Sequence, residues 1–128
     1  MKELYLDTNV LLRYLLGDIP DQFQEAKKII ETIEKGETKG FLSILVVNEL
    51  IWILENYYSL KRNVYIPKLL KLLLIDQIKI MEVKKDILAK ILEKMQKQKI
   101  DFTDMYLVHV APVGKIVSFD QDFKKIHI

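Results

Sequence analysis

A carboxylate stands at an abrupt change of pattern near the start of the chain. The apolar run of residues 4–6 stops at Asp7, and a helical pattern of apolar residues begins directly after it. In a parallel α/β sheet, ligands and metal ions bind just outside the carboxyl ends of the strands. Asp7 is therefore a candidate ligand at such an edge, although the same side chain can also cap the helix that follows.

A second carboxylate, Glu49, lies among apolar residues. If residues 44–57 form a helix, the neighbours of Glu49 one turn away on either side are Leu45, Val46, Trp52 and Ile53. This stripe predicts that Glu49 is buried, and burial disfavours the ionised form of a carboxylate unless another charge compensates. The compensating charge would be a metal ion, a lysine or an arginine. A rim position in contact with water is the remaining alternative.

Two further pairs of aspartates stand at the boundaries of predicted elements. Asp101 and Asp104 lie one helical turn apart at the start of a short helix, where an N-cap and a first-turn acid are both ordinary. Asp120 is the first residue beyond the apolar run 116–119, just as Asp7 is the first residue beyond the run 4–6. Asp122 by itself is explained as turn chemistry.

Four of these carboxylates gain meaning as a set: Asp7, Glu49, Asp104 and Asp120. Two come from strand ends and two from helix starts, so all four can reach one carboxyl edge of a sheet. Clustered carboxylates raise one another's pKa unless a cation compensates. Oxygen ligands without histidine or cysteine suit a hard divalent ion, Mg²⁺ or Mn²⁺. Such an ion activates a water and stabilises a leaving oxyanion, which is the chemistry of phosphoryl-group reactions.

The remaining polar residues add little competing chemistry. The chain has no cysteine, which excludes disulfides, zinc–thiolate sites and thiol nucleophiles. It has neither a glycine-rich phosphate loop nor a Ser-His-Asp pattern, and we expect His109 to be structural. Arg13, in the helix after the first carboxylate, is expected to contact a phosphate or the acidic set. The lysines, together with Arg62 beside Lys61, are expected mostly on solvated faces, where some could touch a phosphate backbone.

Length and composition are those of one domain, residues 1–128. Half of the 128 residues are hydrophobic, which supplies a substantial core, and the net charge of +2 neither requires nor opposes a nucleic-acid partner. The N-terminal apolar run is too short for a signal peptide, and no apolar run approaches the length of a membrane span. We therefore expect a soluble protein of the cytoplasm.

Alternating strands and helices must position these side chains. Apolar runs and alternation predict strands at residues 4–6, 40–43, 77–83 and 115–119, the first of them buried. Amphipathic spacing, caps and breakers predict helices at residues 8–16, 21–36, 44–57, 66–74, 86–99 and 102–110, with Ser43 as the N-cap of the third. Such alternation favours a parallel sheet covered by helices on both faces, which is a three-layer α/β/α arrangement.

Four segments resemble motifs of the PIN-domain family, and of its VapC-type ribonuclease toxins in particular. The first is the opening D-T-N-V-L-L-R-Y-L of residues 7–15, and the second is N-E-L at residues 48–50. The third is D-F-T-D-M-Y-L at residues 101–107. The fourth, V-S-F-D-Q-D-F at residues 117–123, is similar to the closing T-F-D-x-D-F element, with Ser118 in place of threonine. Each motif is weak alone, but four in this order along the whole chain are specific.

The resemblance implies a compact α/β/α fold and metal-dependent endonucleolytic cleavage of RNA. Carried over by position, the metal ligands or water activators would be Asp7, Glu49, Asp104 and Asp120. The supporting groups would be Asp101, Asp122, Asn9 and Ser118, the last two as polar side chains that orient the carboxylates. The bound ion would be Mg²⁺ or Mn²⁺. Residues 109–114 depart from the family pattern, which puts the local geometry after the third motif in question.

The resemblance also implies partners, and the residues leave two other functions open. RNA would be the substrate, the chain would form a homodimer, and a cognate antitoxin protein would hold it inactive by placing its tail in the acidic pocket. A PIN-like domain could instead bind a metal or a basic partner without cutting RNA. A phosphotransfer domain would use Asp7 as a nucleophile, but its expected second acid is missing, since position 9 is asparagine and position 6 is leucine.

Overall fold

The structure is a computed structural model that describes residues 1–119. The predicted ligand Asp120 and the supporting acid Asp122 lie outside the described residues. Within the described part, every helix is too short or too polar to span a bilayer.

Three parallel strands form the sheet of the described residues, in the order β1-β2-β3. Their bounds are Lys2–Tyr5 for β1, Thr38–Leu42 for β2 and Ile78–Ile80 for β3. Leu4 is paired with Gly40, which is paired in turn with Ile78 on the far strand. Because the strands are parallel, their carboxyl ends share one edge of the sheet, and Asp7 follows β1 at that edge.

Three of the four predicted strands are confirmed, with shifted bounds. β1 and β2 begin earlier than predicted, and β3 is shorter because residues 81–83 bend away from the sheet. The strand predicted at residues 115–119 is wrong: the segment pairs with no strand of the described part, and Val117 and Phe119 are fully exposed. An apolar run becomes a strand only where a neighbouring backbone supplies its hydrogen bonds.

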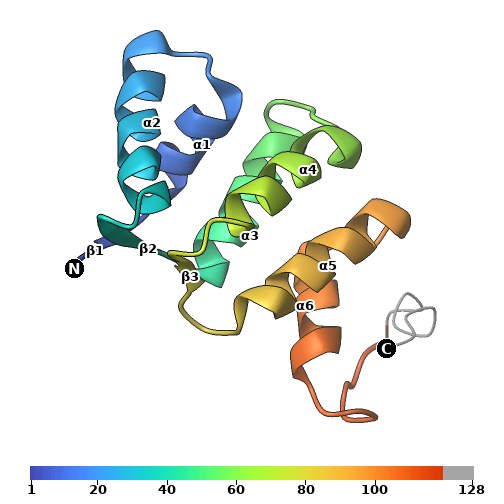
Figure 1. The fold of residues 1–128 in the computed structure, drawn as a ribbon. Coiled ribbons are helices and arrows are strands. Elements are labelled where there is room, and N and C mark those ends of the chain that lie inside the picture. Colours follow the sequence, from blue (N-terminus) through green and yellow to red (C-terminus); the bar gives the residue numbers. More distant parts are fainter. Residues whose placement is uncertain (120–128) are drawn as a thin grey trace.

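Six helices are present among residues 1–119, and Figure 1 shows them from blue (α1 and α2) through green (α3 and α4) to orange (α5 and α6). Their bounds are Thr8–Leu16 (α1), Pro20–Glu34 (α2), Ile44–Asn56 (α3), Arg62–Leu73 (α4), Lys85–Lys97 (α5) and Phe102–Val110 (α6). All six predicted helices are confirmed. α4 begins before the predicted residue 66, because Ser59, at φ 54°, makes the turn and leaves residues 62–64 free to form the first helical turn.

The core lies between the helices and one face of the sheet. Its fully buried members include Leu11, Ile30, Leu50, Ile66, Ile78 and Ile91. Gly40 allows β2 to approach α2 closely, since a Cβ there would lie 2.7 Å from Ile33 Cδ1 and 3.0 Å from Ile78 Cδ1. The prediction that the first strand is buried is wrong for its other face, where Tyr5 is 64% exposed and stacks on Phe41 at 5.0 Å.

Candidate functional site

Asp7 lies where β1 gives way to α1. The backbone N–H of Leu6 donates to the carbonyl of Phe41 at 3.0 Å, so the hydrogen-bonding ladder reaches the residue before the acid. Asp7 has extended backbone angles, φ −85° and ψ 159°, and its Oδ1 accepts a 2.7 Å bond from the N–H of Thr8. The predicted helix cap is therefore confirmed. The side chain is exposed, so the cap leaves the carboxylate accessible to a second partner.

Glu49 is exposed on α3, and the prediction that it is buried is wrong. The helix turns this stripe outward: Leu45 is 77% and Trp52 is 63% exposed, whereas Leu50 and Ile51 point into the core. The outer face also carries the exposed Asn48 and Asn56, a polar signal that the two large apolar side chains obscure in the sequence. An exposed carboxylate requires no compensating charge, so the case for Glu49 as a ligand rests on its placement alone.

The start of α3 is fixed by a carboxylate that the sequence reasoning missed. Glu82 follows β3 at the carboxyl edge; its Oε2 accepts from Ser43 Oγ at 2.5 Å and its Oε1 accepts from the N–H of Ile44 at 2.8 Å. Ser43 is the predicted N-cap, and its Oγ accepts from the N–H of Leu45 at 3.1 Å. A negative charge at a helix N-terminus is stabilising. The strand predicted at residues 77–83 placed Glu82 inside a strand; because β3 ends at Ile80, Glu82 in fact follows the strand, as Asp7 follows β1.

The third motif forms the start of α6. Asp101 occupies the predicted N-cap position, although its side chain makes no capping bond, and Asp104 lies half-buried in the first turn. The helix dipole favours a negative charge at that position. Thr103 Oγ1 donates to Asn48 Oδ1 across a long 3.4 Å bond. The residues next to Asp104 and Glu49 are therefore in contact, which brings the second and third motifs side by side.

Within residues 1–119, the structure brings together the helices that carry Asp7, Glu49 and Asp104. α1 packs against α3, and α3 packs against α6. Among residues 1–119, no three histidine, aspartate or glutamate side chains lie close enough together to hold a metal ion. Asn9 and Ser118, the predicted orienting groups, are both exposed.

Arg13 and His109 are held by structural partners. Arg13 Nη1 donates to both carboxylate oxygens of Asp18 at 2.7 and 2.8 Å, and its Nη2 donates to Tyr58 Oη at 3.5 Å. The bond to Asp18, and then that to Tyr58, raises the pKa of Arg13. Arg13 therefore pairs with Asp18 and not with the proposed acidic set, and its contact with a phosphate stays a prediction. His109 Nδ1 donates to the carbonyl of Met105 at 2.9 Å and is structural, as predicted.

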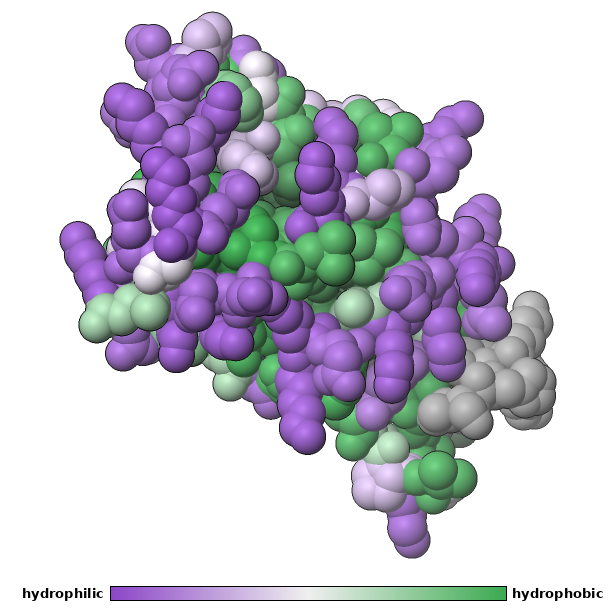
Figure 2. All heavy atoms as spheres, viewed as in Figure 1, coloured by the Kyte–Doolittle hydropathy of each residue, from purple (hydrophilic) through white to green (hydrophobic). Residues whose placement is uncertain are grey.

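A cleft of about 720 Å³ lies between the α1–α2 pair and α4. Figure 2 shows apolar side chains at its floor and hydrophilic side chains around them. The apolar lining comes from Tyr14, Leu15, Phe23, Leu72, Leu74 and Ile75. Asp7, Glu49 and Asp104 do not line this cleft, so it is separate from the predicted acidic site.

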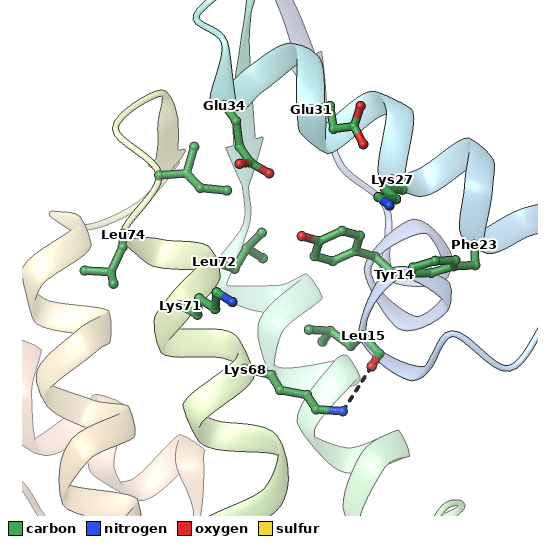
Figure 3. Close-up of a pocket in the computed structure, with 11 residues that line it drawn as sticks. Tyr14, Leu15, Phe23, Lys27, Glu31, Glu34, Lys68, Lys71, Leu72 and Leu74 are labelled. Carbon is green, nitrogen blue, oxygen red and sulfur yellow. Dashed lines mark hydrogen bonds between the residues drawn. The ribbon is translucent and has the colours of Figure 1, made fainter.

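The two sides of the cleft carry opposite net charges, although Lys27 lies beside the two glutamates on α2. Glu31 and Glu34 project from α2, and Lys68 and Lys71 face them from α4, as Figure 3 shows. Lys68 Nζ donates to the carbonyl of Leu15 at 3.4 Å. Burial, together with the negative charges of Glu34 and Glu31, raises the pKa of the Tyr14 hydroxyl inside the cleft.

The chemistry of the candidate donors fits a hard divalent ion. The donors are carboxylate oxygens without histidine or sulfur, which is the set that Mg²⁺ and Mn²⁺ prefer. Asp7 and Glu49 are exposed and Asp104 is half-exposed, so an ion could reach them and keep several of its waters, as Mg²⁺ usually does.

The comparison with known proteins decides the family, since the PIN domain matches residues 4–128. The chain belongs to the PIN domain family. It is also similar to "Ribonuclease VapC2" of Methanocaldococcus jannaschii, with 26% identity over an alignment of 140 positions. This alignment covers 97% of this chain and 89% of the relative. The PIN match confirms the resemblance drawn from the four motifs and the α/β/α fold that it implied.

Proposed function

We propose that this PIN-domain protein is a metal-dependent endoribonuclease that cleaves phosphodiester bonds in RNA as the toxin of a VapBC-type pair. The observation that carries the proposal is the similarity along nearly the whole chain to a PIN relative named as a ribonuclease. The α3–α6 contact supports it, because it sets the Glu49 and Asp104 motifs next to each other. Homodimer formation and a cytoplasmic location remain predictions.

In the proposed site, the ion would be held by Asp7, Glu49, Asp104 and Asp120, with Asp101 and Asp122 as supporting acids. Mg²⁺ or Mn²⁺ bound there would lower the pKa of a water and neutralise charge that develops on the phosphate.

The side chains of the chain would then orient and deprotonate the attacking group. Asp7 is oriented by the N–H of Thr8, and Asp104 faces the positive end of the α6 dipole. Glu49, which is exposed on α3, would accept the proton of the attacking water. In-line attack on phosphorus then breaks one phosphorus–oxygen bond of the RNA chain.

A cleavage assay with matched acid variants tests this proposal. Purified protein is incubated with a pool of single-stranded RNAs in Mg²⁺ or Mn²⁺, with and without EDTA. Asp7→Asn and Glu49→Gln should each lower the rate by about 100-fold or more, since each removes a charge that stabilises the transition state. Asp21→Asn and Glu25→Gln, which alter exposed acids on α2, are the matched controls and should cut normally. Cleavage that persists in EDTA, or in Asp7→Asn at the wild-type rate, would contradict the proposal.

The cleft between the α1–α2 pair and α4 is our proposed docking surface for the antitoxin. Its apolar floor and oppositely charged sides suit an amphipathic helix laid into a groove. Exchanging the charges with Glu34→Lys and Lys71→Glu should weaken inhibition by a co-expressed antitoxin without lowering ribonuclease activity. Full inhibition of both variants would place the antitoxin elsewhere.

The exposure of Glu49 favours one second candidate, a PIN-like module that binds a metal or a basic partner without cutting RNA. An exposed carboxylate can bind such a partner without taking part in catalysis. Calorimetric metal binding, together with no cleavage over a broad RNA panel, would support this candidate over the nuclease.

A further inference from the structure

Arg62 is not on the solvated face where the sequence predicts it. It is the first residue of α4, and only 21% of its side chain is exposed. Its Nη1 donates to three backbone carbonyls: those of Met95 at 3.2 Å, Gln98 at 3.1 Å and Ile100 at 2.8 Å. Carbonyls at a helix C-terminus lack partners within the helix, so this guanidinium satisfies the end of α5 and the turn after it.

The other edge of the same guanidinium is tied to α3. Arg62 Nε donates to Glu55 Oε2 at 3.0 Å, and the buried Tyr65 hydroxyl donates to the same oxygen at 2.5 Å. Arg62 Nη2 also lies 4.0 Å from Asp101 Oδ1. Nη1 has two N–H groups, so one of them is shared between two of the three carbonyls, while Nε serves Glu55; the ammonium of lysine cannot reach both sides in this fixed geometry.

This network joins the two helices that carry proposed metal ligands. Glu55 lies on α3, the helix of Glu49, and residues 98–101 form the turn that leads into α6. Asp104 lies in the first turn of α6, so its position follows from that of the turn. One hydrogen bond joins motif residues of the two helices directly, from Thr103 to Asn48, and it is long at 3.4 Å. Arg62 adds shorter hydrogen bonds between α3 and the turn that precedes α6.

We propose that Arg62 is a positioning residue of the nuclease site, which sets Asp104 of α6 against Glu49 of α3 by clamping the residue 98–101 turn to Glu55. This inference rests on the proposed function. Arg62 contacts neither substrate nor metal in this arrangement, and it acts through the placement of α6.

The test compares Arg62→Gln and Arg62→Lys with Tyr65→Phe. Tyr65→Phe removes one hydrogen bond to Glu55 but leaves the turn clamped, so it controls for lost stability. Three properties are measured below the unfolding temperature of every variant: the Kd for Mn²⁺, kcat and KM for RNA, and amide hydrogen exchange at residues 102–105. Arg62→Gln should weaken Mn²⁺ binding about tenfold and lower kcat by about 10- to 100-fold, with KM little changed and exchange faster at residues 102–105.

Each outcome decides between structural and positioning roles. Tyr65→Phe should keep wild-type Mn²⁺ affinity, and Arg62→Lys should fall between the wild type and Arg62→Gln; if Arg62→Gln does not fold, Arg62→Lys alone carries the comparison. Wild-type Mn²⁺ affinity and kcat in a folded Arg62 variant would overturn the inference, as would an equal loss in Tyr65→Phe at equal stability. A wild-type protein that neither binds Mn²⁺ nor cuts RNA would overturn the proposed function itself.

Discussion

At the scale of single residues, Asp7 serves two chemical purposes that one substitution can separate. Its carboxylate caps α1 through the N–H of Thr8, and asparagine caps a helix about as well as aspartate does. We therefore expect Asp7→Asn to change the free energy of unfolding by no more than a few tenths of a kcal/mol while RNA cleavage is lost. Asp7→Ala should lose cleavage and about 1 kcal/mol of stability as well. Urea unfolding measures the stability and the cleavage assay measures the activity. An Asp7→Asn protein that is stable and fully active would show that Asp7 only caps α1.

Tyr65 gives the protein a predictable response to alkaline pH. Burial, and then the hydrogen bond to Glu55, raises the pKa of its hydroxyl above the ordinary value of 10.0. Because the folded state holds this proton more tightly, its contribution to stability is fully present below the unfolded pKa and is lost as the pH rises above about 10. The free energy of unfolding of the wild type should fall more steeply from pH 9.5 to about 11 than that of Tyr65→Phe. Parallel slopes, measured by urea denaturation, would contradict this assignment.

At the scale of the elements, the helix that carries Glu49 depends on a carboxylate from another strand end. Glu82 accepts bonds from Ser43 and Ile44 at the N-terminus of α3. Glu82→Ala should therefore cost about 1–2 kcal/mol of stability, as the loss of a good helix cap does. Thermal unfolding checks the prediction, with Asp76→Ala, in the exposed turn before β3, as a control that should change little. An equal fall in Tm for both variants would contradict a capping role for Glu82.

The elements themselves could largely be predicted from the sequence, and their outward faces could not. Periodic apolar residues identified all six helices, and Ser43 and Asp7 were found as caps because their local chemistry is self-contained. Burial was preferred to a rim position for Glu49 because Leu45 and Trp52 lie on its side of a mostly apolar helix, and the structure shows the exposed alternative. The segment 115–119 was predicted as a strand on its apolar side chains, but a strand also needs a backbone partner, which local sequence does not specify.

Candidate residues were easier to find than the bonds that hold them. An acid after a strand or at a helix start is visible in the sequence, whereas the three carbonyls that bind Arg62 come from a turn more than thirty positions away along the chain. Long-range partners of this kind depend on the packing of α4 against α5 and on no local pattern.

At the scale of the whole molecule, the exposed apolar side chains of α3 bear on the expected homodimer. Leu45 and Trp52 are 77% and 63% exposed and lie two helical turns apart on the same outer face. We expect light scattering to give twice the chain mass of 15.1 kDa for the wild type, and the mass of one chain for Trp52→Ser. Leu74→Ser alters another residue that is 80% exposed and should leave the mass unchanged. A monomeric wild type at micromolar concentration would contradict the expected homodimer.

The central claim, that the acids of this PIN domain converge on one hard ion, is tested most directly by Mn²⁺ binding in solution, because this measurement does not depend on knowing the RNA target. Free Mn²⁺ is followed by electron paramagnetic resonance as protein is added. We expect saturable Mn²⁺ binding by the wild type. The affinity for Mn²⁺ should fall at least about tenfold in Asp7→Asn, Glu49→Gln or Asp104→Asn and stay unchanged in the control Asp21→Asn. Wild-type protein that binds no Mn²⁺, or acid variants that bind it as tightly as the control, would contradict the claim.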